Sequence, residues 1–437
     1  MAKSLFRKTL SAPGLLRVVR GRFDRIEDPV AGRGLNLTDC LMSGLAVFGL
    51  KYPSLLSFDR DARENALIRS NLKSLYGVGR SPSDTRLRER LDEVDPGGLR
   101  GAFKAVFAAL QRGKGLEGFD WMGHYLLSVD GTGYFSSSRV HCDRCCRTHH
   151  RDGRVTYYHQ LLGAVLAHPE RREVFPLAPE PILKDDGAKK NDCERNAAKR
   201  MLGHVRREHP HLKLIVVEDA LASNGPHIGL LKELDMRFIL GAKPGDHQFL
   251  FQWVESTPGT RTFETTGRDG TAHRFRYHNG APLNDANFEL EVNFLEYWEL
   301  KPNGTRRHFS WVTDLPVEDS NLMDLMRAGR ARWRIENETF NTLKNAGYGF
   351  EHNFGHGEDQ LATVFACLMM LAFLIDQVQQ RCCALFRAAK AQAGRALYFW
   401  ERLRSLFLNF VLPDWETLYR TLAFGHRARV PIPLGPG

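Results

Sequence analysis

Hydrophobic positions recur at helical spacing in the first 120 residues of the chain. Residues 37–50 (LTDCLMSGLAVFGL) begin with Thr38 or Asp39 as a possible cap and continue with apolar residues on one face. Residues 81–94 (SPSDTRLRERLDEV) have Pro82 and Asp84 at their start and several arginines along their length. We therefore expect residues 1–120 to form a helical N-terminal region, in which a DNA-binding unit and ordinary surface helices are both open interpretations.

From residue 125 the pattern changes to short apolar runs that are typical of strands. Such runs lie at 125–129, 156–166 and 173–177, and a basic amphipathic helix capped by Asn191 or Asp192 follows at 191–209. A largely apolar run at 212–217, a helix at 227–234 and a strand at 237–242 complete the series. This order predicts an α/β fold with a mixed sheet over residues 121–245.

Residues 246–316 alternate aromatic and polar positions across turn signals. The pairs Asn279-Gly280 and Asn303-Gly304 are expected to be hairpin turns, so this segment is predicted to be a β-rich insertion. A decorative lobe and a direct DNA contact remain alternative roles for it. A helix is then predicted over 326–345 (MRAGRARWRIENETFNTLKN), after the possible caps Asp319, Ser320 and Asn321.

The helix at 326–345 belongs to a segment, 317–357, that is expected to complete the core. Residues three, four and seven apart share a helical face, which here brings together Arg332, Glu336, Phe340 and Leu343. Taken alone, the window favours a solvated, charged surface helix.

Residues 358–437 are predicted to be a helical C-terminal region. Its apolar stretch at 361–378 is interrupted by Asp376 and preceded by Glu358 and Asp359, which favours a buried helix over a membrane span. The opening residues, MAKSLFRKTLSAPGLL, lack the long apolar core of a signal peptide. We expect a cytoplasmic protein without membrane contact.

Composition adds a candidate partner. The 437 residues carry a formal net charge of +10, and 43% of them are hydrophobic, which is sufficient for two or three domains with real cores. A strongly basic chain favours a polyanionic partner, nucleic acid before membrane.

Three acids are candidates for a site at the carboxyl ends of the strands, where α/β sheets bind their ligands. Asp130 is expected to end the strand at 125–129, before a glycine turn, and Asp219 follows the strand at 212–217. Glu336, from a helix packed on the sheet, would complete a three-carboxylate site for divalent cations, which prefer oxygen ligands. Any one of these acids alone is more often a turn cap.

A cysteine and histidine cluster follows the first strand. Cys142, Cys145, Cys146 and His149 or His150 offer zinc ligands from one short loop, and structural zinc and reduced thiols are both open. His352 and His356 lie four apart with no glutamate as a partner between them, so we expect them to line a DNA groove or cap a turn.

In three segments the sequence resembles bacterial insertion-sequence transposases of the DDE type. These segments are SVDGTGYFSS around Asp130, LIVVEDALASNGPHI around Asp219 and RWRIENETFNTLKNAGYGFEHNFGHG around Glu336. A long second gap with a β-rich insertion is the layout of the cut-and-paste branch, whose last helix has a Tyr, Arg, Glu, Lys signature. Arg332 and Glu336 match that signature, Gly329 takes the place of the tyrosine, and Lys344 comes one residue later than expected.

The resemblance implies a ribonuclease-H-like core and a reaction. Mg²⁺ or Mn²⁺ held by Asp130, Asp219 and Glu336 would serve cleavage at transposon ends and strand transfer into target DNA. Arg332, Lys344 and Arg334 would contact DNA, with Glu338 as the alternative third ligand. The expected partner is double-stranded DNA bound by a homodimer at the bacterial nucleoid. A metal-dependent nuclease without strand transfer and a non-catalytic DNA-binding relative are the alternatives.

Overall fold

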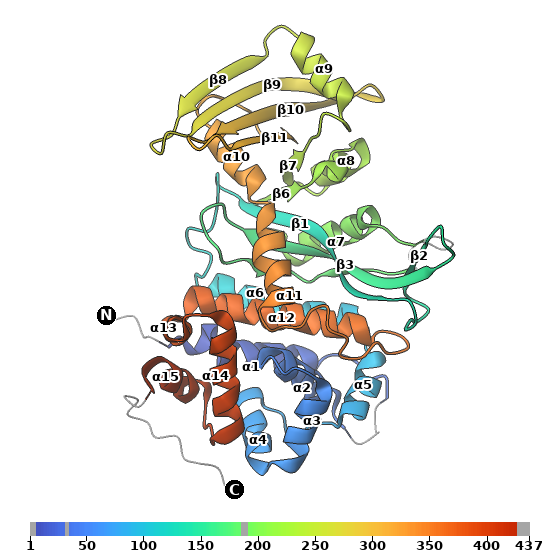
Figure 1. Ribbon diagram of the computed structural model, residues 1–437, viewed down its shortest axis with the longest axis vertical. Coiled ribbons are helices and arrows are strands. Elements are labelled where there is room, and N and C mark those ends of the chain that lie inside the picture. Colours follow the sequence, from blue (N-terminus) through green and yellow to red (C-terminus); the bar gives the residue numbers. More distant parts are fainter. Residues whose placement is uncertain (1–5, 31–34, 185–190, 426–437) are drawn as a thin grey trace.

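One mixed sheet of eleven strands forms the middle and upper parts of the molecule, and helices gather below it (Figure 1). The computed structural model describes residues 6–30, 35–184 and 191–425. The strands follow the order β2-β3-β1-β6-β7-β11-β10-β9-β8, with the short β4 and β5 paired to β3. The protein is therefore a mixed α/β protein, as the hydrophobic pattern predicts.

The half of the sheet that contains the predicted acids is built around β1 (Tyr125–Ser137). It pairs antiparallel with β3 (Val155–Ala167) and parallel with β6 (Leu214–Glu218), which in turn runs parallel to β7 (Arg237–Gly241). The edge beyond β3 is formed by β2 (Cys146–His149), β4 (Phe175–Pro176) and β5 (Glu180–Ile182). Two helices connect the parallel strands, α7 (Glu194–Glu208) before β6 and α8 (Gly225–Glu233) before β7.

The first strand is longer than predicted. The expected glycine turn after Asp130 is wrong, because β1 continues to Ser137 and Asp130 pairs with Gly163 of β3 within the ladder. Gly131 is a strand residue against which the Glu194 carboxylate lies, since an added Cβ would be 2.1 Å from Glu194 Oε1 and that side chain would have to shift. The glycine therefore marks a close approach and not a turn.

The β-rich segment extends the same sheet. It contains β8 (Arg261–Thr266), β9 (Ala272–Asn284), β10 (Asn287–Leu300) and β11 (Arg306–Thr313), and β11 joins β7. Asn303-Gly304 is in the predicted turn before β11, but Asn279-Gly280 lies inside β9, where the pairing with β10 shifts register. A helix that the pattern did not predict, α9 (Gln248–Ser256), precedes these strands.

The predicted helix at 326–345 is interrupted. It begins as α10 (Leu322–Arg330), turns at residues 331 and 332, and continues as a π-helix (Ile335–Phe340) and then α11 (Asn341–Asn345). A π-helical turn changes which side chains share a face, and such turns are frequent at functional sites.

Helices from both ends of the chain pack together below the sheet (Figure 1). The N-terminal ones are α1 (Ala12–Phe23), α2 (Leu37–Gly49), α3 (Leu55–Glu64), α4 (Ala66–Asn71), α5 (Asp84–Asp92) and α6 (Arg100–Arg112). The C-terminal ones are α12 (Leu361–Cys382), α13 (Ala384–Ala393), α14 (Ala396–Asn409) and α15 (Trp415–Phe424). By length and composition α12 is apolar enough to cross a membrane, but 83% of its most apolar window is buried inside the protein. It is the buried helix that the sequence predicts.

Candidate functional site

Asp130 and Asp219 lie at matching positions on neighbouring parallel strands. The last pair in the β1–β6 register is Ser128 with Val217, and each aspartate stands two residues beyond its member of that pair. Neighbouring strands lie about 4.8 Å apart, and residues at equal positions along them face the same side of the sheet. Both aspartates line one cavity of about 720 Å³ at this end of β6. Asp219 also caps the short helix Ala220–Ala222 by accepting from the Leu221 N–H at 2.9 Å.

The π-helix brings Glu336 to β1. Its apolar residues Ile335 and Phe340 pack against Gly163 of β3, where an added Cβ would meet the Phe340 ring at 3.0 Å and Ile335 at 3.4 Å. The turn before the π-helix is tied to β1, because the buried Ser128 hydroxyl donates to the Arg332 carbonyl at 2.8 Å. Gly163 is the β-ladder partner of Asp130, so this packing places the π-helix directly beside the first aspartate.

Arg332 connects Glu336 with Asp130. Its Nη1 lies 3.1 Å from Asp130 Oδ2 and 2.7 Å from Glu336 Oε1. The resemblance assigns Arg332 to a DNA phosphate, whereas here its guanidinium bridges two of the three predicted metal ligands. Arg334, the predicted DNA contact, and Glu338, the alternative third ligand, form a separate ion pair at 3.0 Å.

The surroundings of Asp130 disfavour the charged form of its carboxyl group. Burial raises its pKa to about 7, Arg332 opposes that rise, and the neighbouring Glu336 carboxylate adds to it. A carboxyl group with a pKa this far above its ordinary value, at the wall of a cavity, is a candidate for a functional role.

A fourth acid, Glu194, belongs to the same cavity and was missed by the sequence analysis. It is the first residue of α7, its carboxylate lies against Gly131, and it lines the cavity together with Asp130 and Asp219. Burial and then the charges of Asp219 and Glu218 raise its pKa. Its position at the start of a predicted helix, opposite an intrastrand glycine, gives no signal in the sequence.

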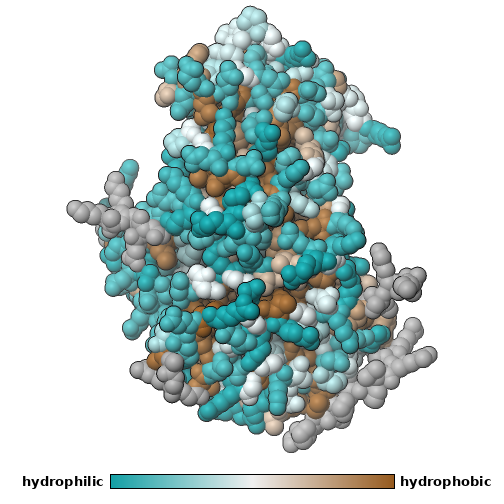
Figure 2. All heavy atoms as spheres, turned by 180° about the vertical axis from the view of Figure 1, so that it is seen from behind, coloured by the Kyte–Doolittle hydropathy of each residue, from teal (hydrophilic) through white to brown (hydrophobic). Residues whose placement is uncertain are grey.

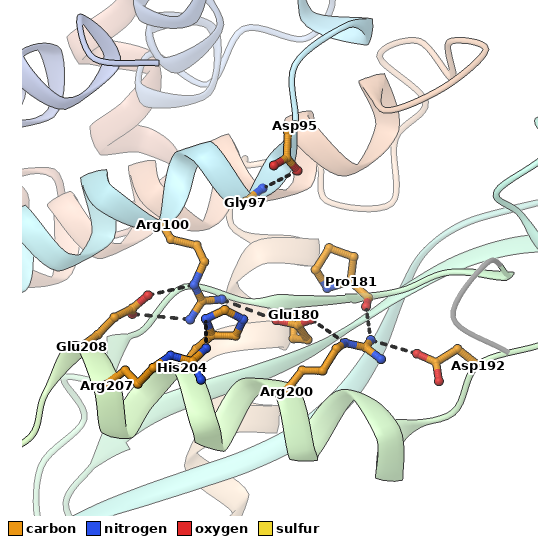
Figure 3. A network of polar contacts seen from close by, with 10 residues as sticks. All are labelled: Asp95, Gly97, Arg100, Glu180, Pro181, Asp192, Arg200, His204, Arg207 and Glu208. Atoms are coloured by element: carbon orange, nitrogen blue, oxygen red, sulfur yellow. Dashed lines mark hydrogen bonds and ion pairs between the residues drawn. The ribbon is translucent and has the colours of Figure 1, made fainter. Parts of the chain in front are cut away.

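The orientation of α7 is fixed by a network of ion pairs (Figure 3). Arg200 of α7 contacts Glu180 and Asp192 at 2.8 Å each, and Arg100 of α6 reaches Glu208 at 2.8 Å and Glu180 at 3.4 Å. The predicted cap by Asn191 or Asp192 is wrong, because Cys193 is the residue that precedes α7 and Asp192 pairs with Arg200. The network ties the helix that contains Glu194 to the sheet edge and to the N-terminal helices.

A buried acid–histidine pair supports the end of β6. Glu218 Oε2 lies 2.5 Å from His227 Nε2, and both side chains are buried beside Asp219. Burial alone would lower the pKa of His227, but the Glu218 carboxylate outweighs it and raises that pKa. The charged pair holds β6 and α8 together next to the second aspartate.

A second cavity, of about 1020 Å³, is lined by residues of α10, the π-helix and the β10–β11 hairpin, among others. We call it the arginine groove after the five arginines that line it, Arg268, Arg307, Arg327, Arg330 and Arg334. Trp333, half exposed, lies on its wall.

Seen from behind relative to Figure 1, the surface is mainly hydrophilic, and hydrophobic side chains form smaller separate patches (Figure 2).

The three predicted DNA-binding residues occupy different surroundings. Arg332 bridges the acids, and Arg334 lines the arginine groove while it bonds to Glu338 and to the Pro169 carbonyl. Lys344 pairs with Glu351 at 2.7 Å and lines neither cavity. Arg334 and Arg332 are thus close to the candidate site, whereas Lys344 is engaged elsewhere.

The structure changes the ligand set of the cysteine and histidine cluster. Cys142 and Cys145 come together with His159 of β3 and with His356, and these four side chains are buried and could bind a metal such as zinc. Cys146 and His149 are not members: Cys146 Sγ faces the Ile182 carbonyl at 3.7 Å, and His149 is exposed on β2. The expectation that His356 lines a groove or caps a turn is also wrong, because it is buried in this cluster. Hydrogen bonds from Cys145, and next from His159 and His356, lower the pKa of the Cys142 thiol.

Comparison with known proteins gives little beyond this geometry. No family model matches the sequence, and no curated protein matches it. Among solved structures, a piggyBac transposase synaptic complex with hairpin DNA is similar, with 9% sequence identity and a TM-score of 0.41 over 96% of this chain and 78% of that one. A likeness of this size is too small to establish a shared fold, so the function proposed below rests on the site itself.

Proposed function

We propose that this chain is a DNA transposase of the DDE type, which cuts DNA at transposon ends and joins the freed ends to target DNA. The observation that carries the proposal is the matched position of Asp130 and Asp219 on β1 and β6, with Glu336 joined to Asp130 through Arg332. In the sheet, β3 runs antiparallel to β1, whereas β6 and β7 run parallel to β1. This order supports a ribonuclease-H-like core made of residues 121–245 and 317–357.

The donor set fits Mg²⁺ or Mn²⁺. Asp130, Asp219 and Glu194 line one cavity, and Glu336 is joined to Asp130 through Arg332. All four offer carboxylate oxygens, the donors that hard divalent cations prefer. The pKa of Asp130 and that of Glu194 are both raised, in part by neighbouring acids, and a cation between the carboxylates would relieve that repulsion. Bound divalent ions in such enzymes activate a nucleophile and stabilise the leaving oxygen.

The remaining residues would bind and orient DNA. The arginine groove offers five guanidinium groups for phosphate contacts, and such contacts give affinity without reading sequence. Arg332 contacts Asp130 and Glu336, and its chain neighbours Ala331 and Trp333 line the arginine groove. We infer that its planar guanidinium can hold a phosphate at the reacting bond by two hydrogen bonds. We further propose that the insertion (246–316) contributes groove contacts, that the helical regions (1–120 and 358–437) assist binding, and that a cytoplasmic homodimer assembles on the double-stranded DNA.

The test uses a plasmid that contains the native DNA flanking the coding region, searched first for short inverted repeats. Purified wild-type chain with Mg²⁺ or Mn²⁺ should cut at the repeat ends and join them to a target plasmid. Asp130→Ala, Asp219→Ala and Glu336→Ala should each abolish cleavage and leave DNA binding largely intact, because the acids serve the metal and the basic surface serves affinity. Glu194→Gln should lower cleavage without abolishing it.

Each other outcome has a definite meaning. Cleavage without joined products would make the chain a metal-dependent nuclease. Binding to the repeats with no cleavage under any divalent ion would make it a non-catalytic DNA-binding protein. Cleavage near the wild-type rate in any of the three alanine variants would remove that acid from the site.

A further inference from the structure

Four buried side chains outside the carboxylate site converge on one point. Cys142 Sγ lies 3.8 Å from Cys145 Sγ and 3.5 Å from His159 Nε2. Cys145 Sγ lies 3.3 Å from His159 Nε2 and 3.6 Å from His356 Nε2. All four ligand atoms fall within 4.8 Å of one another.

The four sulfur–sulfur and sulfur–nitrogen distances given above agree with those around one zinc ion, and the other two pairs of ligand atoms lie within 4.8 Å. With Zn–S of about 2.3 Å and Zn–N of about 2.0–2.1 Å, a regular tetrahedron has its two sulfurs about 3.8 Å apart and each sulfur about 3.5 Å from each nitrogen. The observed distances of 3.8 Å and 3.3–3.6 Å match these values. Four donors within 4.8 Å of one another would have room between them for a single ion and not for an iron–sulfur cluster.

Charge balance also favours zinc. Two thiolates and two neutral imidazoles around Zn²⁺ have no net charge, so the assembly can be buried without an unpaired ion. Cys142, Cys145, His159 and His356 are all at most 7% exposed. Two cysteines and two histidines are among the ligand sets of closed structural zinc sites.

The four ligands come from three separate segments. Cys142 and Cys145 lie in the loop between β1 and β2, His159 lies in β3, and His356 lies in the loop from residue 346 to 360 that joins α11 to α12. His356 stands between Gly355 and Gly357, whose φ angles of +141° and +74° are in the region that favours glycine. These glycines let the chain bend so that the histidine enters the cluster.

Other contacts bring the same segments together. Arg144, between the two cysteines, forms an ion pair with Asp359 in the α11–α12 loop. The ring of His356 packs on Phe135 of β1, with centroids 4.2 Å apart. Asp92 of α5 accepts from the backbone N–H groups of residues 358–361, which closes the end of the loop onto the N-terminal helices.

We propose that Cys142, Cys145, His159 and His356 bind one structural zinc ion that fastens the loop between α11 and α12 to the sheet. The ion would link β3 and the loop after β1, the strand of Asp130, to the loop that follows α11. It is independent of the proposed reaction, because none of its ligands lines the carboxylate cavity.

The first experiment measures metal content in the full chain, produced in zinc-supplemented medium. Elemental analysis should find about one zinc per wild-type chain. His356→Ala should lose the metal, whereas His356→Cys, which restores a ligand, should keep it. Cys146→Ser and His149→Ala, the neighbouring residues outside the cluster, are matched controls and should retain about one zinc.

The second experiment uses wild-type protein alone, so it does not depend on whether a variant folds. Zinc-depleted chain that still has its native circular dichroism should bind Co²⁺ and develop the strong visible bands of a tetrahedral site with thiolate ligands. Depletion should also speed proteolysis within residues 346–360, and added Zn²⁺ should restore protection.

Three results would overturn the proposal. Folded wild-type protein with neither zinc nor Co²⁺ binding would mean that the cluster is a set of free thiols and imidazoles. Loss of zinc in Cys146→Ser or His149→Ala would mean that the ligand set is wrong. Unchanged proteolysis of the loop on depletion would remove the fastening role.

Discussion

Asp130 and Glu336, 206 positions apart in the chain, are held by the same nitrogen atom, Nη1 of Arg332. The bridge joins a residue in the middle of a buried strand to a residue on a π-helix. The two acids therefore lie in one site, and Arg332 contacts both of them. A substitution at any of the three residues should also affect the other two.

Loss of Arg332 should act on chemistry more than on affinity. Arg332→Ala should weaken binding to long DNA only modestly, because many other Lys and Arg contribute to the salt-dependent term. Cleavage should fall about 100-fold or more, since charge stabilisation at the reacting phosphate is lost. Arg332→Lys should rescue poorly, because an ammonium cannot reproduce the paired hydrogen bonds of a guanidinium. Gel-shift and end-cleavage assays on the same preparations measure both quantities.

The control for Arg332 is chosen from the structure. Arg330, two residues away, is unsuitable because it pairs with the buried Glu299 at 2.8 Å, so its removal would leave a buried charge. Arg327 has an exposed side chain and only a 3.6 Å contact with Glu170. Arg327 also lines the arginine groove, so Arg327→Ala should weaken DNA binding about as modestly as Arg332→Ala does. It should leave cleavage near the wild-type rate, and equal losses of cleavage from the two variants would make this helix a charged surface only.

Glu336 and Glu338 should differ sharply. Glu336→Gln should abolish cleavage, whereas Glu338→Gln should keep substantial activity, because Glu338 pairs with Arg334 at 3.0 Å and not with the Asp130 cluster. Measured cleavage rates for the two variants check this. A dead Glu338→Gln beside an active Glu336→Gln would show that the functional register of the π-helix differs from the one seen here.

Much of this site could be anticipated from the sequence, for definite reasons. The apolar runs before Asp130 and Asp219 predict two buried strands, and the four-residue spacing of Arg332 and Glu336 predicts the contact that they make at 2.7 Å. The extension of β1 past Asp130 could not be predicted, because Gly131 resembles a turn residue but lies inside the strand, against the Glu194 carboxylate. Nothing local distinguishes these two uses of glycine.

The metal cluster illustrates the other limit. The Cys142–Cys145 spacing marks a candidate site, but its partners lie at sequence separations of 17 and 211 residues, beyond any local motif. The available signals were His159 within a strand and His356 between two glycines. Neither becomes a ligand until β3 and the α11–α12 loop are brought together by the fold. The π-helix was hidden for a similar reason, since its register depends on packing against Gly163.

The raised pKa of Asp130 predicts a pH-dependent effect on stability. Below its ordinary value of 3.8 the carboxyl is protonated in both states, and between 3.8 and about 7 only the unfolded chain loses the proton. The contribution of Asp130 to stability therefore declines as pH rises through this range and is least favourable above pH 7. Asp130→Asn should raise the melting temperature in Mg²⁺-free buffer more at pH 8 than at pH 4.5. An equal shift at the two pH values would contradict this assignment, and Mg²⁺ should stabilise wild type but not Asp130→Asn.

The Glu218–His227 pair predicts a pH dependence of the opposite sign. The Glu218 carboxylate raises the pKa of His227 in the folded protein, so the stabilisation by charged histidine is fully present below the ordinary value of 6.5. It is lost as pH rises through the folded pKa. His227→Gln should thus be more destabilising at pH 6 than at pH 9, by about 1.5–3 kcal/mol if one charged hydrogen bond is lost. Urea unfolding at the two pH values measures this, and the double variant Glu218→Gln/His227→Gln, in which both titrating groups of the pair are gone, is the control. A destabilisation by His227→Gln that is the same at both pH values would mean that the buried pair is neutral, and that the end of β6 beside Asp219 is held by packing alone.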